Sequence, residues 1–240
     1  MQATRKALKV EEIVDLFYAR QIAYDMLRRF FMEEPSKEYL SLFIQENVLD
    51  AFPFQEESEL IASGVKSITN FLEKSKPIIS SRDYDDLHWD YTRLLIGPFE
   101  VPAPPWESVY LRTDRLLFQK TTMDVRKLYQ KYGFQAADYN MEADDHIGLE
   151  LDFMFRLNSL CIESCATIVD TSVPEVIYLL KEQNNFMRNH LGKFAPAFAK
   201  NVIQHAETEF YAGMGMILEG FIDMDSSVLS ELLNIELIKE

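Results

Sequence analysis

Apolar residues recur along most of the chain at the three- and four-residue spacing of amphipathic helices. The first stripe predicts a helix over 13–31 that ends before Pro35, and Ser80 with Asp83 resembles a capping box that opens another. Further helices are expected over 36–47, 58–74, 80–96, 106–132, 147–168, 172–192, 195–219 and 226–238. No segment shows a convincing β-strand pattern. The sequence therefore predicts an all-α protein of about ten helices.

One segment, residues 97–105, interrupts the helical pattern. Four of its nine residues are proline, which excludes a helix and favours a stiff, extended path. Its apolar residues, together with Trp106, distinguish it from a polar linker. We expect this rigid loop to pack on another part of the protein or to be packed upon.

The length suits one domain that spans residues 1–240. We expect it to consist of two helical halves, an N-terminal half over about 1–133 and a C-terminal half over about 145–240. Residues 134–144 have the character of a hinge between them. No internal repeat or low-complexity tract divides the chain further.

The acidic net charge limits the kinds of partner that the protein can bind. Lys and Arg number 24 against 39 Asp and Glu, a net charge of −15, and such a surface repels the phosphates of nucleic acids. The same field attracts a cationic peptide segment. No apolar run approaches the ~18 residues that span a membrane, and the first residues lack an export-signal pattern. Cys161 and Cys165 lie four apart in a helical stretch, so we expect free thiols and a reducing cytoplasm.

The motifs of enzymes and metal proteins do not occur. No Glu-x-x-His unit of a di-iron bundle occurs, and two cysteines are too few for a structural zinc site. The chain has neither a phosphate-binding Gly-x-x-x-x-Gly-Lys-Ser/Thr loop nor a Gly-x-Ser-x-Gly elbow. We therefore expect no catalytic residue, no metal and no cofactor.

Residues 142–151, EADDHIGLEL, concentrate acidic groups and a histidine at the start of a predicted helix. Asp144 and Asp145 suit a helix N-terminus, and His146 and Glu150, four apart, can pair and raise the pKa of the histidine. That interpretation is structural. In the alternative, Asp145 holds an arginine of a partner bidentately, with His146 as its neighbour.

Three blocks in this order and spacing resemble the TorD/DmsD family of molybdoenzyme maturation chaperones. The first block covers 89–111, with Trp89-Asp90-Tyr91 and the proline-rich loop, and looks especially like the dimethyl sulfoxide reductase chaperone branch. The second is the 142–151 segment, and the third covers 186–198. The resemblance spans roughly residues 10–220.

The resemblance implies an all-helical, non-catalytic cytoplasmic protein. Such proteins bind the twin-arginine leader peptide of a molybdopterin-containing oxidoreductase, sometimes with the mature catalytic subunit, and delay export until the cofactor is inserted. Some relatives form domain-swapped dimers, so we expect a monomer or such a dimer. The matching leader-binding positions are Tyr91, Leu94, Leu95, Pro105, Trp106, Asp145 and His146.

The residues themselves fit this function. Tyr91 and Trp106 can line an apolar groove, and the acidic segment around Asp145 can receive a cationic head. One alternative is an assembly chaperone for a non-exported client, as in nitrate reductase maturation. Another is a weak nucleotide-binding protein that uses Asp145 and His146, although the chain lacks a phosphate loop.

Overall fold

The computed structural model describes residues 7–74, 79–98, 100–111, 114, 116–135, 142–166 and 172–238. In this part of the chain ten α-helices follow one another: α1 (Val14–Met32), α2 (Lys37–Gln45), α3 (Glu59–Glu73), α4 (Ser81–Tyr91), α5 (Glu107–Leu111), α6 (Lys120–Lys131), α7 (Ile147–Ala166), α8 (Ser172–Asn189), α9 (Leu191–His205) and α10 (Glu209–Leu232). A 3₁₀ turn, η1 (Val10–Ile13), precedes α1, and a π-helical turn, η2 (Thr92–Ile96), continues α4. The all-α prediction is confirmed.

Side chains begin several of these helices as the sequence predicts. The hydroxyl of Ser80 accepts a hydrogen bond from the backbone N–H of Asp83 at the start of α4. Ser36 and Ser58 play the same part for α2 and α3. Each bond satisfies a donor that the first helical turn would otherwise leave unpaired.

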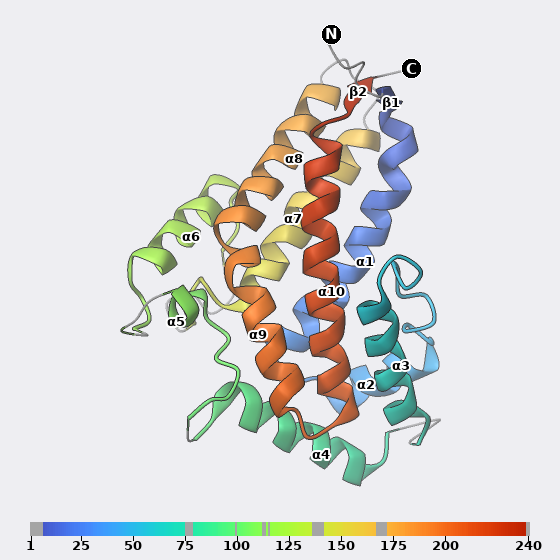
Figure 1. Cartoon of the computed structure of the whole chain (residues 1–240), viewed down its shortest axis with the longest axis vertical. Helices are drawn as coiled ribbons and strands as arrows, with labels where there is room; N and C mark the ends of the chain where they lie inside the picture. Colours follow the sequence, from blue (N-terminus) through green and yellow to red (C-terminus); the bar gives the residue numbers. More distant parts are fainter. Residues whose placement is uncertain are drawn as a thin grey trace.

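The long helices pack side by side around one apolar core (Figure 1). Helix α1 packs against α7, and α10 lies against α3 on one side and α9 on the other. Helix α4 crosses one end of this bundle, and α5 and α6 project from its side (Figure 1). Helices α1 and α3 from the first part of the chain thus share a core with α7 and α10 from the last part.

Two glycines allow α3 and α10 to approach closely. A Cβ atom on Gly64 would lie 2.6 Å from the carbonyl oxygen of Gly213, and a Cβ on Gly213 would lie 2.6 Å from that of Gly64. Any larger residue at either position would push the two backbones apart. The Gly213-Met214-Gly215 stretch is therefore a helix-packing element.

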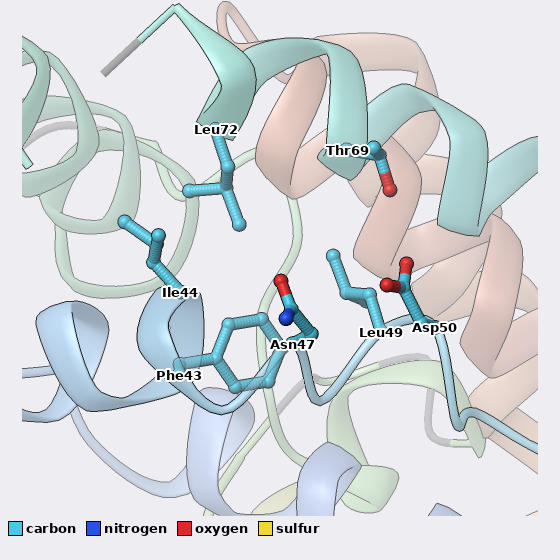
Figure 2. Close-up of a pocket in the computed structure, with 7 residues that line it drawn as sticks. All are labelled: Phe43, Ile44, Asn47, Leu49, Asp50, Thr69 and Leu72. Atoms are coloured by element: carbon cyan, nitrogen blue, oxygen red, sulfur yellow. The ribbon is translucent and has the colours of Figure 1, made fainter. Parts of the chain in front are cut away.

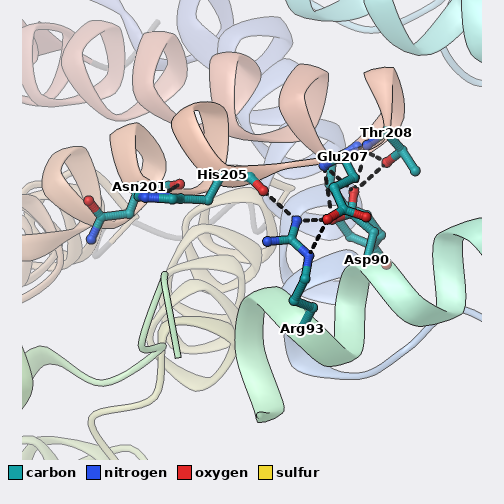
Figure 3. A network of polar contacts seen from close by, with 7 residues as sticks. Asp90, Arg93, Asn201, His205, Glu207 and Thr208 are labelled. Carbon is teal, nitrogen blue, oxygen red and sulfur yellow. Dashed lines mark hydrogen bonds and ion pairs between the residues drawn. The ribbon is translucent and has the colours of Figure 1, made fainter. Parts of the chain in front are cut away.

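A buried carboxylate fixes the start of α10 against α4 (Figure 3). Asp90 accepts hydrogen bonds from the backbone N–H of Glu207 at 3.1 Å, and from the N–H and hydroxyl of Thr208 at 2.8 and 2.7 Å. Arg93 adds an ion pair to Asp90 at 2.8 Å and one to Glu207 at 3.1 Å, and it donates to the carbonyl of His205. Thr208 in turn caps α10.

The predicted helix over 106–132 is wrong in one respect, because α5 ends at Leu111 and α6 begins at Lys120. Between them the carboxylate of Asp114 accepts a hydrogen bond from the N–H of Leu116, a local bond that competes with helix. Phe118 adopts a left-handed backbone with φ of +56°. The helical spacing of apolar residues continues across this break, so the sequence pattern gives no sign of it.

The helices predicted over 195–219 and 226–238 are also misplaced. The observed boundary lies between α9 and α10, where Asp90 and Thr208 provide the capping bonds, and α10 then runs to Leu232 without interruption. Beyond it, β2 (Glu236–Ile238) pairs in parallel with β1 (Ala7–Lys9). The prediction of no β-structure missed this two-stranded ribbon, which is too short to show a pattern.

Two expectations reach beyond the described residues. Positions 136–141 of the expected 134–144 hinge and the end of the expected 147–168 helix lie outside them. Within the described part of the chain, no helix combines the length and the apolar character needed to cross a membrane. Cys161 and Cys165 are free thiols, and burial raises their pKa values to about 12 and about 11.

Candidate functional site

Four of the seven candidate residues meet where the proline-rich loop passes the start of α7. The N–H of Glu107 donates to the carbonyl of Asp145 at 2.9 Å, and the N–H of Ile147 donates to the carbonyl of Pro105 at 2.7 Å. These two bonds form an isolated antiparallel bridge between Trp106 and His146. The bridge places Pro105 and Trp106 directly against Asp145 and His146.

Trp106 is held in a fixed orientation at the surface of this bridge. Its indole N–H donates to Oε1 of Glu142 at 2.6 Å. Its ring stands edge-on to the imidazole of His146, with centroids 6.1 Å apart and an angle of 72° between the planes. The side chain is half-buried, so part of this oriented aromatic surface faces solvent.

His146 lies beneath the tryptophan as a neutral ring. Its Nδ1 accepts a hydrogen bond from the N–H of Gly148 at 3.1 Å. Burial lowers the pKa of His146, and the nearby carboxylates of Glu142 and Asp145 only partly oppose this. The expected ion pair with Glu150 does not form, and the pKa shift is opposite to the expected one, because desolvation outweighs the surrounding negative charge.

Asp145 connects three elements from a fully buried position. One carboxylate oxygen accepts from the N–H of Ser108 in α5 at 2.8 Å, and the other accepts from the hydroxyl of Thr122 in α6 at 2.8 Å. Asp145 itself precedes α7. In this conformation both oxygens are occupied and neither faces solvent, so the carboxylate holds α5 and α6 in place beside Trp106.

The other three candidates form the floor behind the proline-rich loop. Tyr91 ends α4, while Leu94 and Leu95 lie in η2, and all three are buried. The carbonyl of Leu94 accepts a hydrogen bond from the N–H of Ala103 at 3.1 Å, which ties η2 to the loop. π-helical turns are frequent at functional sites.

Acidic groups at the end of α1 complete this region, and sequence reasoning did not identify them. Burial raises the pKa of Tyr91, and the carboxylates of Glu34, Glu33 and Glu142 raise it further, so all three lie near its hydroxyl. Glu33 is exposed, and Glu34 is 2.8 Å from Nδ1 of His88. Their proximity depends on tertiary packing that residue spacing does not reveal.

Gly148 allows the close packing of α7 on α1 that places these carboxylates. A Cβ atom on Gly148 would lie 2.6 Å from the Cα of Met32. The start of α7 can therefore rest on the last turn of α1 only with glycine at position 148. This contact brings Glu33 and Glu34 toward the Trp106–His146 bridge.

Two hollows help to delimit the site. A hollow of about 20 Å³ between α2 and α3, lined by Phe43, Ile44 and Leu72 among others, has room for about one water (Figure 2). It contains none of the candidate residues. A larger hollow of about 400 Å³ lies beside the site, where Asp144 pairs with Arg126 at 2.7 Å next to Tyr129 and Phe134.

No cluster of three or more His, Cys, Asp or Glu side chains in the described residues is arranged to hold a metal ion. His205 and Glu207, at the junction of α9 and α10, make structural contacts. The imidazole of His205 lies 2.9 Å from the carbonyl of Asn201, and Glu207 pairs with Arg93. The region around Trp106 offers an oriented aromatic surface and a carboxylate, which are groups for binding a cationic and apolar segment.

Comparison with known proteins gives consistent matches. Residues 55–200 match the family model described as nitrate reductase delta subunit. The chaperone protein TorD of Aliivibrio salmonicida is 29% identical over 209 residues, which cover 86% of this chain and 93% of that protein. TorD of Vibrio parahaemolyticus is 24% identical over 92% of this chain and 99% of that protein. The Tat proofreading chaperone DmsD of Salmonella typhi is 28% identical over 53% of this chain and 54% of that protein.

Proposed function

Because the chain belongs to the nitrate reductase delta subunit family, which includes the TorD and DmsD chaperones, we propose that it binds a twin-arginine leader peptide. The leader belongs to a molybdopterin-containing oxidoreductase, and binding delays its export until the cofactor is inserted. The protein is a molybdoenzyme maturation chaperone and not an enzyme. We place it in the cytoplasm, where such a leader is available before export.

The observation that carries this proposal is the Trp106–His146 bridge with its surrounding carboxylates. An oriented, half-buried tryptophan gives a large contact area at little cost in side-chain entropy. Glu142 binds the indole of Trp106, and the carboxylates of Glu33 and Glu34 act on the hydroxyl of Tyr91 behind the loop. Carboxylates pair with arginine bidentately. Together they suit a segment with a cationic head followed by apolar residues.

The seven candidate residues divide into two roles under this proposal. Trp106 contacts the apolar part of the leader, while Pro105 and the buried floor of Tyr91, Leu94 and Leu95 support the loop that presents it. Asp145 and His146 position Trp106 and α5, since both are buried and hydrogen-bonded inside the protein. The more exposed carboxylates, first of all that of Glu142, pair directly with the arginines of the leader.

Calorimetry with a synthetic twin-arginine leader tests the aromatic contact. Trp106→Ala should weaken binding by about 2 kcal/mol or more, since central aromatic anchors dominate peptide interfaces. Trp89→Ala is the matched control, because Trp89 is the other tryptophan of the chain and is 66% exposed on α4. Equal affinity in the Trp106 variant, with its fold intact, would remove this residue from the site.

The salt dependence of leader binding distinguishes the partly exposed carboxylate of Glu142 from the buried carboxylate of Asp145. Glu142→Gln should weaken binding most at low salt and little at high salt, because partly exposed charges are screened. Asp145→Asn should weaken it by a similar factor at all salt concentrations, because it acts by positioning. A salt-dependent loss in Asp145→Asn would instead show that the buried carboxylate opens to meet the arginine.

A second candidate function rests on the family model itself, whose description names nitrate reductase. Members of that type assemble a catalytic subunit that carries no exported leader. Binding to the mature catalytic subunit, with no measurable binding to the leader peptide, would favour this function over the first.

We also propose that the chain exists as a monomer or as a dimer that exchanges its C-terminal half, residues 145–240, across the 134–144 hinge. In an exchanged dimer the contacts between the two halves of the monomer are made between two chains, and the contacts within each half are unchanged.

A further inference from the structure

Two glutamates outside the proposed peptide site lie buried together in the protein. Glu107, the residue after Trp106, belongs to α5, and Glu150 belongs to the first turn of α7. Both residues are 0% exposed. Their carboxyl groups lie within hydrogen-bonding reach of each other.

The hydrogen bonds around this pair are incomplete. Oε2 of Glu107 is 3.1 Å from Nδ1 of His190, which must carry a proton to donate to it. Among the described residues, Oε1 of Glu107 and both oxygens of Glu150 receive no hydrogen bond from any N–H or O–H group. Buried carboxylates left in this state are strongly unfavourable.

The groups facing the pair supply little compensating charge. Asp145 adds a third carboxylate, and Tyr129 of α6 contributes a neutral phenol whose pKa is itself raised by burial and by Glu150. His190 is the one basic group that contacts the pair in the described residues, and the described acidic side chains include no arrangement for a metal ion. A proton is the cation that this enclosed space can hold.

We propose that Glu107 and Glu150 share one proton at neutral pH, and that this shared proton holds α5, with Trp106 at its start, against α7. Glu150 carries the proton and donates it to Oε1 of Glu107, while His190 donates to Oε2. This assignment gives every oxygen of Glu107 a donor. Loss of the proton places two negative charges side by side in the core and separates the helices.

The expected titration supports this arrangement. Burial raises the pKa of Glu150 well above its ordinary value, and the adjacent carboxylates of Glu107 and Asp145 raise it further. Since the unfolded chain loses this proton at an ordinary glutamate pKa, the folded protein binds more protons above that pH. Stability therefore falls as pH rises from the ordinary pKa of glutamate to the raised value, by up to about tenfold in the unfolding constant per pH unit.

Carbon-13 NMR of glutamate-labelled protein tests the shared proton directly. The carboxyl signal of Glu150, assigned by its absence in Glu150→Gln, should show a protonated acid at neutral pH and should titrate well above the range of exposed glutamates. A carboxylate signal for both Glu107 and Glu150 at pH 7 would overturn the proposal.

Stability against pH provides an independent readout with matched variants. In Glu150→Gln the amide can donate to Glu107 without titrating. The free energy of unfolding should therefore fall less steeply between pH 5 and pH 8, with a slope that corresponds to one proton fewer. Glu231→Gln, an exposed control, should retain the full decline. If Glu150→Gln keeps the same slope as the parent, no proton is shared here.

The fluorescence of Trp106 tests the coupling to α5. In a Trp89→Phe background it is the only tryptophan left, and its emission should shift toward that of an exposed indole as pH rises through the transition. Adding Glu150→Gln should abolish this shift. A shift that persists in the double variant would assign the movement to other groups, such as Glu142, and would overturn the coupling.

Discussion

At the scale of single residues, the protein depends on buried charges whose partners come from distant parts of the chain. Arg20 on α1 is fully buried and binds Asp225 of α10 through Nε at 2.5 Å and through Nη2 at 3.0 Å. It also donates to the side-chain oxygens of Asn158 and Gln183, each at 2.8 Å. The hydroxyl of Tyr24 donates to Asp225 at 2.6 Å. This network links α1, α7, α8 and α10.

Removal of one partner from that network should be costly. Asp225→Ala leaves the guanidinium of Arg20 buried without its counter-ion, and we expect a loss of about 3–5 kcal/mol in the free energy of unfolding, measured by urea denaturation. Asp25→Ala is the control, because its pairs with Arg28 and Arg29 are partly exposed, and it should change stability by at most about 1 kcal/mol. Similar losses in both variants would contradict this explanation.

The sequence predicted which residue types gather at the site, but it could not predict which of them are buried. The 142–151 segment stood out by its charges, and the structure does bring Asp145 and His146 next to Trp106. Which carboxylates point outward depends on donors from Ser108 and Thr122, which lie 37 and 23 positions away from Asp145. No local pattern encodes bonds of that range.

At the scale of secondary-structure elements, the caps decide where helices begin. Asp90→Ala would leave the N–H groups of Glu207 and Thr208, together with the Thr208 hydroxyl, without their acceptor. We expect a loss of about 2–4 kcal/mol in the free energy of unfolding, and faster amide exchange in the first turn of α10.

Two comparisons sharpen this test. Asp90→Asn keeps an acceptor oxygen and should lose clearly less stability than Asp90→Ala. Ser36→Ala removes an exposed cap from α2 and should lose about 1 kcal/mol. Unchanged exchange rates at Glu207 and Thr208 in Asp90→Ala would show that α10 begins independently of α4.

The same caps explain which elements could be predicted from sequence. The 58–74 helix was predicted closely because Ser58 caps it locally. The boundary before α10 was misplaced because its acceptor, Asp90, lies 118 positions from Thr208. The break between α5 and α6 was missed because apolar spacing continues through it.

At the scale of the whole molecule, an aromatic cluster joins α6 to the C-terminal half. Tyr129 lies 4.8 Å from both Phe134 and Phe153, measured between ring centroids, and Phe153 lies 4.9 Å from Phe186. An exchange of residues 145–240 between two chains would break this cluster and remake it with the partner. The exchange should therefore be slow.

Size-exclusion chromatography with light scattering tests the exchange. We expect separable monomer and dimer fractions that interconvert slowly, and faster interconversion in Phe153→Ala, which removes the central ring of the cluster. The exposed aromatic substitution Tyr18→Ala serves as a control, since Tyr18 lies on α1 and is 52% exposed. A chain that stays monomeric at every concentration would rule out the exchanged dimer.

The ribbon of β1 and β2 brings two distant segments together: Ala7 pairs with Glu236 and Lys9 pairs with Ile238 (Figure 1). Because the strands are parallel, residue 238 lies about 7 Å along the strand direction from residue 7. A linker of about six residues could join them covalently. The polypeptide could thus be circularised, or its gene permuted with new ends opened between α2 and α3, and the helical bundle would keep its connectivity everywhere else.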